Sequence, residues 1–430
     1  MRTSLSETID STIRKGLCTG CGTCSGLCPS SAIEMVIKKD IYVASINPKK
    51  CNNCGLCSKV CPGREVDFNR LNQEIFGKKS ENILLGNYLK TYVGYASNTD
   101  IRYNAASGGL ITQLLIFALE KGIINSAMVT KMEEGSLKPK PSIVRTKEEI
   151  IKAAQSKYCP VPANVALRGL FDSRCDENGN VAIVGLPCHI HGIRNAERYM
   201  PEMRKMVLFH LGLFCSHTIT FKGTRFLLEK LKVKKEQINE ISYRGRGWPG
   251  KLTLKFTNHR ILEIPYPEYY DSGFGLFIPA RCLLCYDFTN ELADISFGDA
   301  WLPEFAHDIN GRSIIIVRSK IGMNLLQKAS SEGVVVISEI SPEKIIESQK
   351  SLLFKKRGLK ARMDFRRILR KENPSYHCPL MKPQPIDYIR SLWMYFWTYT
   401  SHQMTLQSLL KIYSARQRVF RKYGSGILWC

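Results

Sequence analysis

The pattern of hydrophobic and polar positions changes twice along the chain and divides it into three parts. Residues 1–75 are short loops and turns interrupted by cysteines, whereas residues 88–345 alternate short apolar runs with longer helical patterns. Residues 346–430 are basic, aromatic and helical in character. Alternating strand and helix signals are typical of an α/β domain. We therefore expect an α+β chain with a small cysteine-rich domain, an α/β domain with a mixed sheet, and a helical tail.

Within the middle part the apolar runs predict individual elements. Strands are expected over 91–97, 141–146, 181–184, 206–209 and 313–319, with a hairpin over 251–256 and 260–264. The runs at 181–184 and 206–209 are bounded by Gly or Pro, which is typical of buried parallel strands. A helix is expected from residue 110 to Gly122, and Thr146 with Glu149 form a capping-box pattern for another helix that runs to about residue 155.

Composition and charge bound the class of protein. The chain has 430 residues, of which 23% are charged and 44% hydrophobic, so it is globular rather than disordered. The formal net charge is +24, and residues 351–430 hold sixteen Lys or Arg against three Asp or Glu. This excess suggests an anionic partner for the tail: a membrane surface, an acidic protein or an anionic cofactor. The polar N-terminus lacks the apolar core of a signal peptide, so we expect a cytoplasmic protein.

Eight of the sixteen cysteines form two copies of one spacing pattern in the first 62 residues. The pattern C-x2-C-x2-C-x3-C-P is met by Cys18, Cys21, Cys24 and Cys28, and again by Cys51, Cys54, Cys57 and Cys61. In bacterial two-cluster ferredoxins the fourth cysteine of each run ligates the other cluster. One [4Fe–4S] cluster is therefore assigned to Cys18, Cys21, Cys24 and Cys61, and the second to Cys51, Cys54, Cys57 and Cys28. A zinc module is the alternative, although zinc motifs rarely repeat such runs.

Four further cysteines occupy positions that suit a third cluster. Cys188 and Cys215 each follow a predicted parallel strand, so both thiols should emerge at the carboxyl edge of one sheet. Cys282 and Cys285 form a C-x2-C pair beside Arg281, which completes a set of four thiolates. On spacing alone, buried free cysteines that simply pack remain an equal alternative. Cys159, Cys175, Cys378 and Cys430 lack partner spacing and are expected to be structural.

From about Thr91 to Trp301 the sequence resembles the beta subunits of coenzyme F420 hydrogenases and dehydrogenases, a family that includes the F420H2 dehydrogenase input subunit and 7-hydroxymethyl chlorophyll a reductase. The matching stretches are 102–109, 155–158, 185–188, 212–215 and 281–299. The resemblance implies an α/β flavin domain with FAD, preceded by a 2[4Fe–4S] ferredoxin-like domain. It also implies a [4Fe–4S] cluster on Cys188, Cys215, Cys282 and Cys285. The tail from residue 345 does not match, and coenzyme F420 as substrate does not follow.

Several polar residues are candidates for the flavin and for proton transfer. Ser107, Gly108 and Gly109 open a predicted helix and are expected to cradle the FAD pyrophosphate, with an ordinary helix cap as the alternative. Ser156 and Lys157 come next, and Lys157 is either a partner of phosphate or reduced flavin, or a solvated surface lysine. His189 and His191 have a near-neutral pKa when free and suit proton transfer, although a structural role is the default. No catalytic role is assigned to Asp287, Asp294 or Asp299, which suit the orientation of Arg281 or of a loop near the cluster.

These features predict an iron–sulfur flavoprotein oxidoreductase that exchanges hydride equivalents at FAD with single electrons from [4Fe–4S] clusters. Coenzyme F420 and ferredoxin are candidate reactants, and a redox partner protein is expected. The alternative is a non-enzymatic electron-relay subunit without flavin. In the tail, Trp393 and Trp397 share one helix face, and packing or protein docking is favoured over attachment to the inner membrane face. Nucleic-acid binding is disfavoured because no recognised motif accompanies the charge.

Overall fold

The computed structural model describes residues 8–171, 180–409 and 411. Its centre is an eight-stranded mixed sheet in the order β13-β3-β12-β11-β7-β6-β4-β5. The four parallel strands at its middle are β4 (Ser126–Met132), β6 (Val181–Gly185), β7 (Val207–Leu213) and β11 (Ile295–Asp299). The antiparallel strands that extend it on both sides are β3 (Lys90–Ala96), β5 (Pro139–Val144), β12 (Ser313–Val317) and β13 (Val335–Glu339). The predicted mixed sheet is confirmed.

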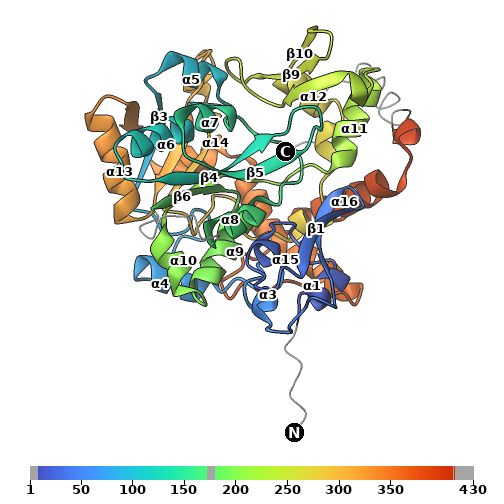
Figure 1. Cartoon of the computed structure of the whole chain (residues 1–430). Coiled ribbons are helices and arrows are strands. Elements are labelled where there is room, and N and C mark those ends of the chain that lie inside the picture. The colour runs from blue at the N-terminus through green and yellow to red at the C-terminus, as the bar shows by residue number, and fades with distance from the viewer. Residues whose placement is uncertain (1–7, 172–179, 410, 412–430) are drawn as a thin grey trace.

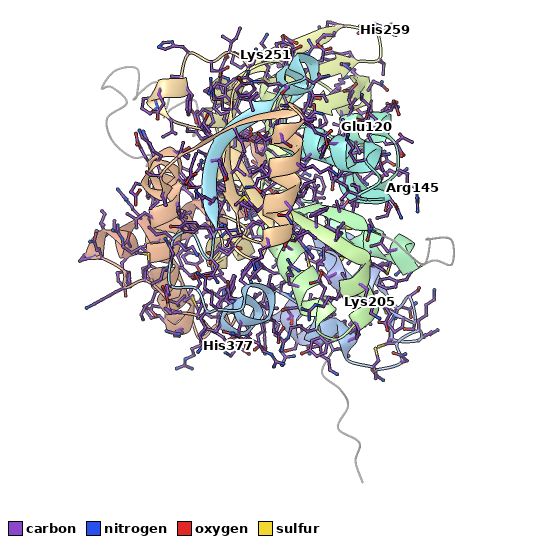
Figure 2. All side chains as sticks on the ribbon, turned by 90° about the vertical axis from the view of Figure 1, so that its left-hand side faces the viewer. Glu120, Arg145, Lys205, Lys251, His259 and His377 are labelled. Atoms are coloured by element: carbon purple, nitrogen blue, oxygen red, sulfur yellow. The ribbon has the colours of Figure 1, made fainter. Side chains whose placement is uncertain are left out.

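Helices cover both faces of this sheet. One face packs against α6 (Leu110–Glu120) and α13 (Lys320–Ser331), with α7 (Lys147–Lys152) at its side (Figure 1). The opposite face packs against α9 (Pro187–Glu197), which begins with a proline at its first position. As expected, Thr146 caps α7 by accepting a hydrogen bond from the N–H of Glu149. Side chains fill the space between the layers, while Glu120, Arg145 and Lys205 point outward (Figure 2).

A smaller sheet lies beside the first. Strands β9 (Lys251–Phe256) and β10 (Ile261–Pro265) form the predicted hairpin, and β8 (Ile238–Ser242) pairs with the other edge of β9. They pack with α11 (Phe221–Lys230) and α12 (Tyr266–Asp271) around their own apolar cluster. The turn after β8 carries the sequence Arg244–Gly250, which reaches back toward the main sheet.

The N-terminal segment contains more regular structure than its loops and turns predicted. It holds α1 (Asp10–Arg14), α2 (Thr23–Gly26), α3 (Leu56–Lys59), α4 (Phe68–Phe76) and an antiparallel hairpin of β1 (Ile33–Lys38) and β2 (Ile41–Ile46). Leu17, Leu27 and Val60 of this segment share one hydrophobic cluster with Ile190 and Ile193 of α9. The segment is therefore packed onto the main sheet. The boundaries proposed at residues 75, 88 and 345 remain predictions.

The described part of the tail includes the long helices α15 (Ser351–Ile368) and α16 (Pro385–Gln403), which pack against each other. Four of the seven basic side chains of α15 are buried, so much of the charge of this helix faces the protein interior: Lys355, Lys356, Arg362 and Arg366. Leu359 of α15 joins the hydrophobic cluster shared by α9 and the N-terminal segment. For α15 the packing interpretation of the tail therefore holds. Among the described helices, none is both long and apolar enough to cross a membrane.

Candidate functional site: three sets of cysteine thiols

The four cysteines Cys188, Cys215, Cys282 and Cys285, here called the third set, line one cavity. Cys188 and Cys215 follow the adjacent parallel strands β6 and β7, so both lie at the same sheet edge, as expected. Cys282 lies in the short 3-10 helix Ala280–Leu284, and Cys285 follows it directly. Burial and then the neighbouring thiols of Cys21, Cys215, Cys285 and Cys282 raise the pKa of Cys188 well above its ordinary value. The thiols of the set therefore face one another.

The shape of this cavity suits a group larger than a single ion. Its atom-free volume is ≈ 850 Å³, part of which opens to solvent. Among the described residues, no three His, Cys, Asp or Glu side chains converge closely enough to bind one metal ion. Thiols that line a wide space fit the four-cysteine ligation of a [4Fe–4S] cluster, in which the ligands surround a cubane rather than one ion.

The N-terminal cysteines form two further sets. Cys18, Cys21, Cys24 and Cys61 are the inner set, and Cys28, Cys51, Cys54 and Cys57 are the outer set. Burial is the main cause that raises the pKa of Cys24 well above its ordinary value, followed by the thiols of Cys21, Cys61, Cys18 and Cys57. Burial also raises the pKa of Cys61 to about 12, with Cys21 and Cys18 as its neighbouring thiols. The structure thus brings together the residues that the sequence assigned to one cluster.

The outer set differs from the inner set in its exposure. Cys51 and Cys57 are partly buried and Cys54 is exposed, whereas Cys21, Cys24 and Cys61 are buried. The pKa of Cys57 is raised, first by burial and also by the nearby thiols of Cys54 and Cys51. The outer set is therefore the one that reaches the molecular surface.

The inner and third sets are neighbours across the junction of the N-terminal segment and the main sheet. Cys18 lines the same cavity as the third set. Arg281 spans the junction: its Nε donates to the carbonyl of Leu17 at 2.9 Å, and its guanidinium also donates to the hydroxyl of Tyr376 at 3.2 Å. Arg281 is 7% exposed, so a cation is held inside the protein between two sets of thiols.

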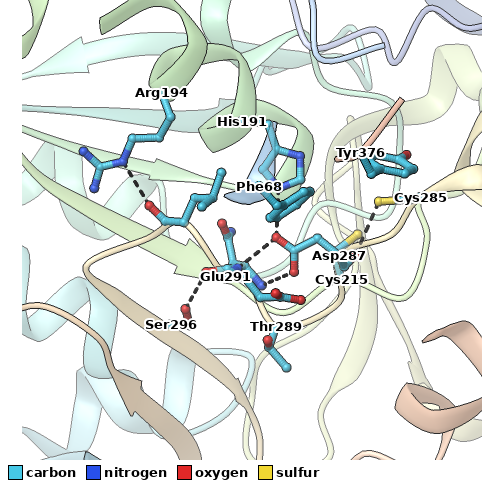
Figure 3. Close-up of polar contacts among 12 residues, drawn as sticks. Phe68, His191, Arg194, Cys215, Cys285, Asp287, Thr289, Glu291, Ser296 and Tyr376 are labelled. Carbon is cyan, nitrogen blue, oxygen red and sulfur yellow. Dashed lines mark hydrogen bonds and ion pairs between the residues drawn. The ribbon is translucent and has the colours of Figure 1, made fainter. Parts of the chain in front are cut away.

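A second buried cation and a carboxylate network hold the third set in place. Lys355 of α15 donates to the carbonyls of Cys215 at 2.6 Å and Ser216 at 2.8 Å. Beside Cys285, the carboxylate of Asp287 accepts hydrogen bonds from the N–H groups of Asn290 and Glu291, both at 2.8 Å (Figure 3). The same carboxylate lies 2.8 Å from Nε2 of His191. Burial raises the pKa of Asp287, but the hydrogen bond and attraction to His191, the attraction to Lys356 and the N–H of Glu291 together outweigh it and lower this pKa to about 2.

The remaining predicted polar residues have structural partners. Nδ1 of His189 accepts the N–H of Leu186 at 3.1 Å, and its Nε2 lies 3.0 Å from the carbonyl of Val161. Burial is the main cause that lowers the pKa of His189 to about 4. Asp294 binds Arg194 and His210, and Asp299 binds Arg244, so neither orients Arg281. Cys159 is buried and Cys378 is partly buried, and neither belongs to the three sets. Cys175, Cys430 and the tail residue Trp429 fall outside the described residues.

The start of α6, predicted as the flavin cradle, is only partly open. The hydroxyl of Ser107 lies 2.8 Å from that of Ser313, and the N–H of Gly108 donates to the same Ser313 oxygen at 3.0 Å. The helix cap is Gly109, whose φ is 74°, and no side chain caps the first N–H groups of α6. Ser107 is therefore not the cap that the sequence suggested. The uncapped N–H groups remain able to face an anion.

Lys157 also has partners inside the protein, so it is not a solvated surface lysine. Its ammonium group donates to the carbonyls of Ala153 at 2.5 Å, Ala154 at 2.6 Å and Gln155 at 2.9 Å, where α7 ends. Burial lowers the pKa of Lys157 to about 7. Ser156 is half-buried beside it. The three donors of this ammonium are used by backbone carbonyls.

One residue near the predicted cradle was missed by the sequence interpretation. Arg244 is 1% exposed and donates to the carbonyl of Ala106 at 2.5 Å and to Asp299 at 3.1 Å. Its guanidinium stacks 4.3 Å from the ring centre of Tyr266, and its Nε has no hydrogen-bond partner. The glycine-rich sequence Arg-Gly-Arg-Gly-Trp-Pro-Gly at 244–250 was the available signal. Two groups at this end of α6 therefore have no hydrogen-bond partner from a side chain: the first N–H groups of the helix and the buried Nε of Arg244.

Comparisons with known proteins agree with this arrangement. Residues 91–168 match the N-terminal family model for the beta subunits of coenzyme F420 hydrogenase/dehydrogenase, and residues 178–343 match the C-terminal model for the same proteins. Residues 17–64 match a 4Fe-4S dicluster domain. Between them, these matches cover the N-terminal segment and the main sheet, but not the tail.

Curated relatives include hydrogenase and dehydrogenase subunits. The beta subunit of the coenzyme F420 hydrogenase of Methanosarcina barkeri is 28% identical over 63% of this chain and 94% of its own length. The F subunit of the F(420)H(2) dehydrogenase of Methanosarcina mazei is 24% identical over 72% of this chain and 81% of its own. The coenzyme F420-dependent sulfite reductase of Methanocaldococcus jannaschii is 27% identical over 78% of this chain, which corresponds to 49% of that protein.

A solved structure shows the same fold. A chain of the F420-reducing [NiFe] hydrogenase complex from Methanosarcina barkeri superposes with a TM-score of 0.53. The match covers 66% of this chain and 96% of that chain at 24% identity.

Proposed function

Because the chain belongs to the beta-subunit family of coenzyme F420 hydrogenases and dehydrogenases, we propose that it is an iron–sulfur flavoprotein oxidoreductase that exchanges hydride equivalents at FAD with single electrons through three [4Fe–4S] clusters. Coenzyme F420 or a ferredoxin is the proposed reactant, and a protein is the proposed redox partner. The inner, outer and third sets of cysteines would each hold one cluster. FAD, when bound, supplies the conversion between two-electron and one-electron chemistry.

The observation that carries this proposal is the adjacency of the three sets. The inner set shares a cavity wall with the third set through Cys18, and the thiol of Cys21 is close enough to Cys188 to raise its pKa. At the other end, Cys57 of the outer set is close enough to Cys24 to raise its pKa. The three sets thus follow in the order third, inner and outer, and the outer set reaches the surface at Cys54. This order gives single electrons a continuous route between the main domain and a partner.

Buried cations along this route have a defined electrostatic role. Arg281 lies between the third and inner sets, and Lys355 lies at the backbone of Cys215. A fixed positive charge in a dry interior stabilises added negative charge nearby. These two side chains therefore favour the reduced state at the junction of the sets.

A specific observation supports the alternative, a non-enzymatic relay without flavin. The polar groups of Ser107, Gly108 and Lys157 are already bonded within the protein. Among the described residues around this helix start, the first N–H groups of α6 lack a side-chain cap, and the Nε of Arg244 is unpartnered but buried. The relay needs the three sets of thiols but no flavin site, so flavin content separates the two functions.

The test is an anaerobic purification followed by iron, sulfide and flavin analysis of the same sample. The proposal predicts about twelve irons and one FAD per chain. Cys188→Ser should lose about four of these irons, because the third set then lacks a ligand. Cys159→Ser is the control, since Cys159 is a buried free cysteine that belongs to no set. About twelve irons without FAD would establish the relay, and about eight irons would refute the third cluster.

A further inference from the structure

Helix α16 has an unusual distribution of polar and apolar side chains. The residues that it buries against the rest of the protein are polar: Asp387, Ser391, Thr398 and Ser401. The residues that it exposes are large and apolar: Ile389 at 66%, Leu392 at 59%, Trp393 at 40%, Phe396 at 53% and Tyr399 at 67%. Their spacing of three and four residues places them along one face of the helix. This exposed stripe is here called the α16 face.

The α16 face is not needed to hold the helix in place. Asp387 caps the helix by accepting the N–H of Gln384 at 2.8 Å, and its carboxylate pairs with Arg357 of α15 at 2.5 Å. Further along, the hydroxyl of Tyr395 donates to the carbonyl of Arg362 at 3.2 Å. Near its end, Lys222 donates to the carbonyl of His402 at 3.1 Å. The polar side therefore anchors α16, which lies along the outer edge of the molecule (Figure 1).

The unpaired charged side chains described around the α16 face are all positive. The single carboxylate of α16, that of Asp387, is buried and paired. Tyr388 binds Asp364 of α15, which places the end of α15 beside the start of the face. That end exposes cations and apolar side chains together: Arg367, Ile368, Leu369, Arg370 and Lys371. Lys382 precedes α16 and is exposed, and Arg390 lies within it. Acidic residues near the helix are paired: Asp364 with Arg367 and Glu372 with Lys15, while Asp40, close to His402 at the helix end, pairs with Arg225.

We infer that the α16 face docks on an anionic membrane surface, with the helix lying in the plane of the interface. Tryptophan, phenylalanine and leucine on one helix face bury themselves at the boundary of head groups and acyl chains. Adjacent Lys and Arg side chains are attracted to anionic lipid. A face whose charge has one sign is complementary to a uniformly anionic surface. This inference goes beyond the proposed redox function, since it concerns where the protein works and uses none of the cysteines.

The test measures binding of the full-length, anaerobically purified protein to lipid vesicles by co-sedimentation. Vesicles of phosphatidylcholine alone are compared with vesicles in which about one third of the lipid is phosphatidylglycerol. We expect binding to the phosphatidylglycerol vesicles. The double variant Leu392→Ser/Phe396→Ser should bind at least about tenfold more weakly, because two buried apolar side chains are lost. The double variant Arg367→Glu/Arg370→Glu should lose the preference for anionic lipid.

Ile309→Ser is the matched control, since Ile309 is 77% exposed but lies outside the tail. It should bind vesicles as the unmodified protein does, and the iron content of every variant reports whether the fold is intact. Binding that is absent, or that the Leu392→Ser/Phe396→Ser variant leaves unchanged, overturns the inference. If the protein does not bind vesicles and elutes as a dimer that this variant returns to monomer, the face is a protein interface instead. None of these readouts depends on flavin or on turnover.

Discussion

At the scale of single residues, the two buried cations near the third set have a measurable consequence. Lys355 is 7% exposed and its ammonium is bonded to the carbonyls of Cys215 and Ser216. Lys355→Met keeps most of the side-chain volume but removes the charge. Because nearby charge tunes the potential of an iron–sulfur cluster, we expect the midpoint potential of the third cluster to become more negative. An anaerobic redox titration followed by electron paramagnetic resonance measures this shift.

The control for this change is Lys360→Met in the same helix, because Lys360 is half-exposed and pairs with Asp364. Solvent screens such a charge, so this variant should leave the cluster potential where it was. Equal shifts of the midpoint potential in both variants would show that the charge of Lys355 beside Cys215 does not tune the cluster specifically.

A second residue-scale prediction concerns pH. His210 is buried between two carboxylates: its Nε2 lies 2.7 Å from Oε1 of Glu197, and its Nδ1 lies 3.0 Å from Oδ2 of Asp294. Burial and the nearby Arg194 lower the pKa of His210, but the two carboxylates outweigh them and raise it above 6.5. A raised pKa in the folded state adds stability that is complete below 6.5 and is lost as the pH rises through the folded value. Urea unfolding at a series of pH values should show this loss in the unmodified protein and not in His210→Gln. His307 is exposed, so the control His307→Gln should lose stability with rising pH as the unmodified protein does. The same pH dependence of stability in His210→Gln would contradict the role given to His210.

Some site residues could be predicted from sequence and others could not. Cys188 and Cys215 were predicted to meet because each follows a strand, and neighbouring parallel strands end at one sheet edge. The sequence did not predict that the ammonium of Lys157 binds the carbonyls of Ala153 and Ala154. Every residue type has a backbone carbonyl, so a bond to one cannot be recognised from the residue types. Arg244 was missed for a related reason: its partners Ala106 and Asp299 are far away in the sequence.

At the scale of elements, the contact of α2 with α9 explains how the N-terminal segment is seated. A Cβ atom on Gly192 of α9 would collide with the side chain of Thr23 in α2. Gly192→Ala should therefore push the two helices apart and reduce the free energy of unfolding by about 1–3 kcal/mol. Urea unfolding of the anaerobic protein measures this change.

Gly169→Ala provides the matched control in helix α8 (Arg168–Phe171), because the nearest atom to a Cβ there is 3.9 Å away. In that position alanine should stabilise the protein by about 0.5–1 kcal/mol through its better helix propensity. A loss of stability in Gly169→Ala similar to that in Gly192→Ala would mean that helix contact is not the cause.

Elements with strong patterns were predicted best. The runs at 181–184 and 206–209 became β6 and β7, which are parallel, and the hairpin of β9 and β10 formed as expected. The hairpin of β1 and β2 was missed because its turn uses Lys39 and Asp40, which adopt positive φ values of 49° and 64° without the glycine that usually signals such a turn. Its strands are largely half-buried, so their alternation is weak.

At the scale of the whole molecule, the three parts of the chain share one interior. Val66 of the N-terminal segment donates its N–H to the carbonyl of Ser375 in the tail at 2.9 Å. Arg366 of α15 donates to the carbonyl of Lys15 at 3.2 Å, and Arg362 donates to that of Leu283 at 2.5 Å. Composition divides the chain into three segments, but the packing joins them. Some of the basic residues of the tail therefore make these internal contacts. The sequence alone does not distinguish such buried basic residues from those on the surface.

This shared interior predicts a single unfolding transition for the holoprotein. The inner and outer sets would carry about two thirds of the cluster absorbance, whereas the five tryptophans all follow residue 75 and report through fluorescence on the rest of the chain. Since Leu17, Leu27 and Val60 pack with Ile190 and Leu359, removing either part exposes the core of the other. Cluster absorbance and tryptophan fluorescence should therefore be lost at the same urea concentration under anaerobic conditions. Loss of about two thirds of the absorbance at lower urea, with fluorescence intact, would instead identify the N-terminal segment as an independent unit.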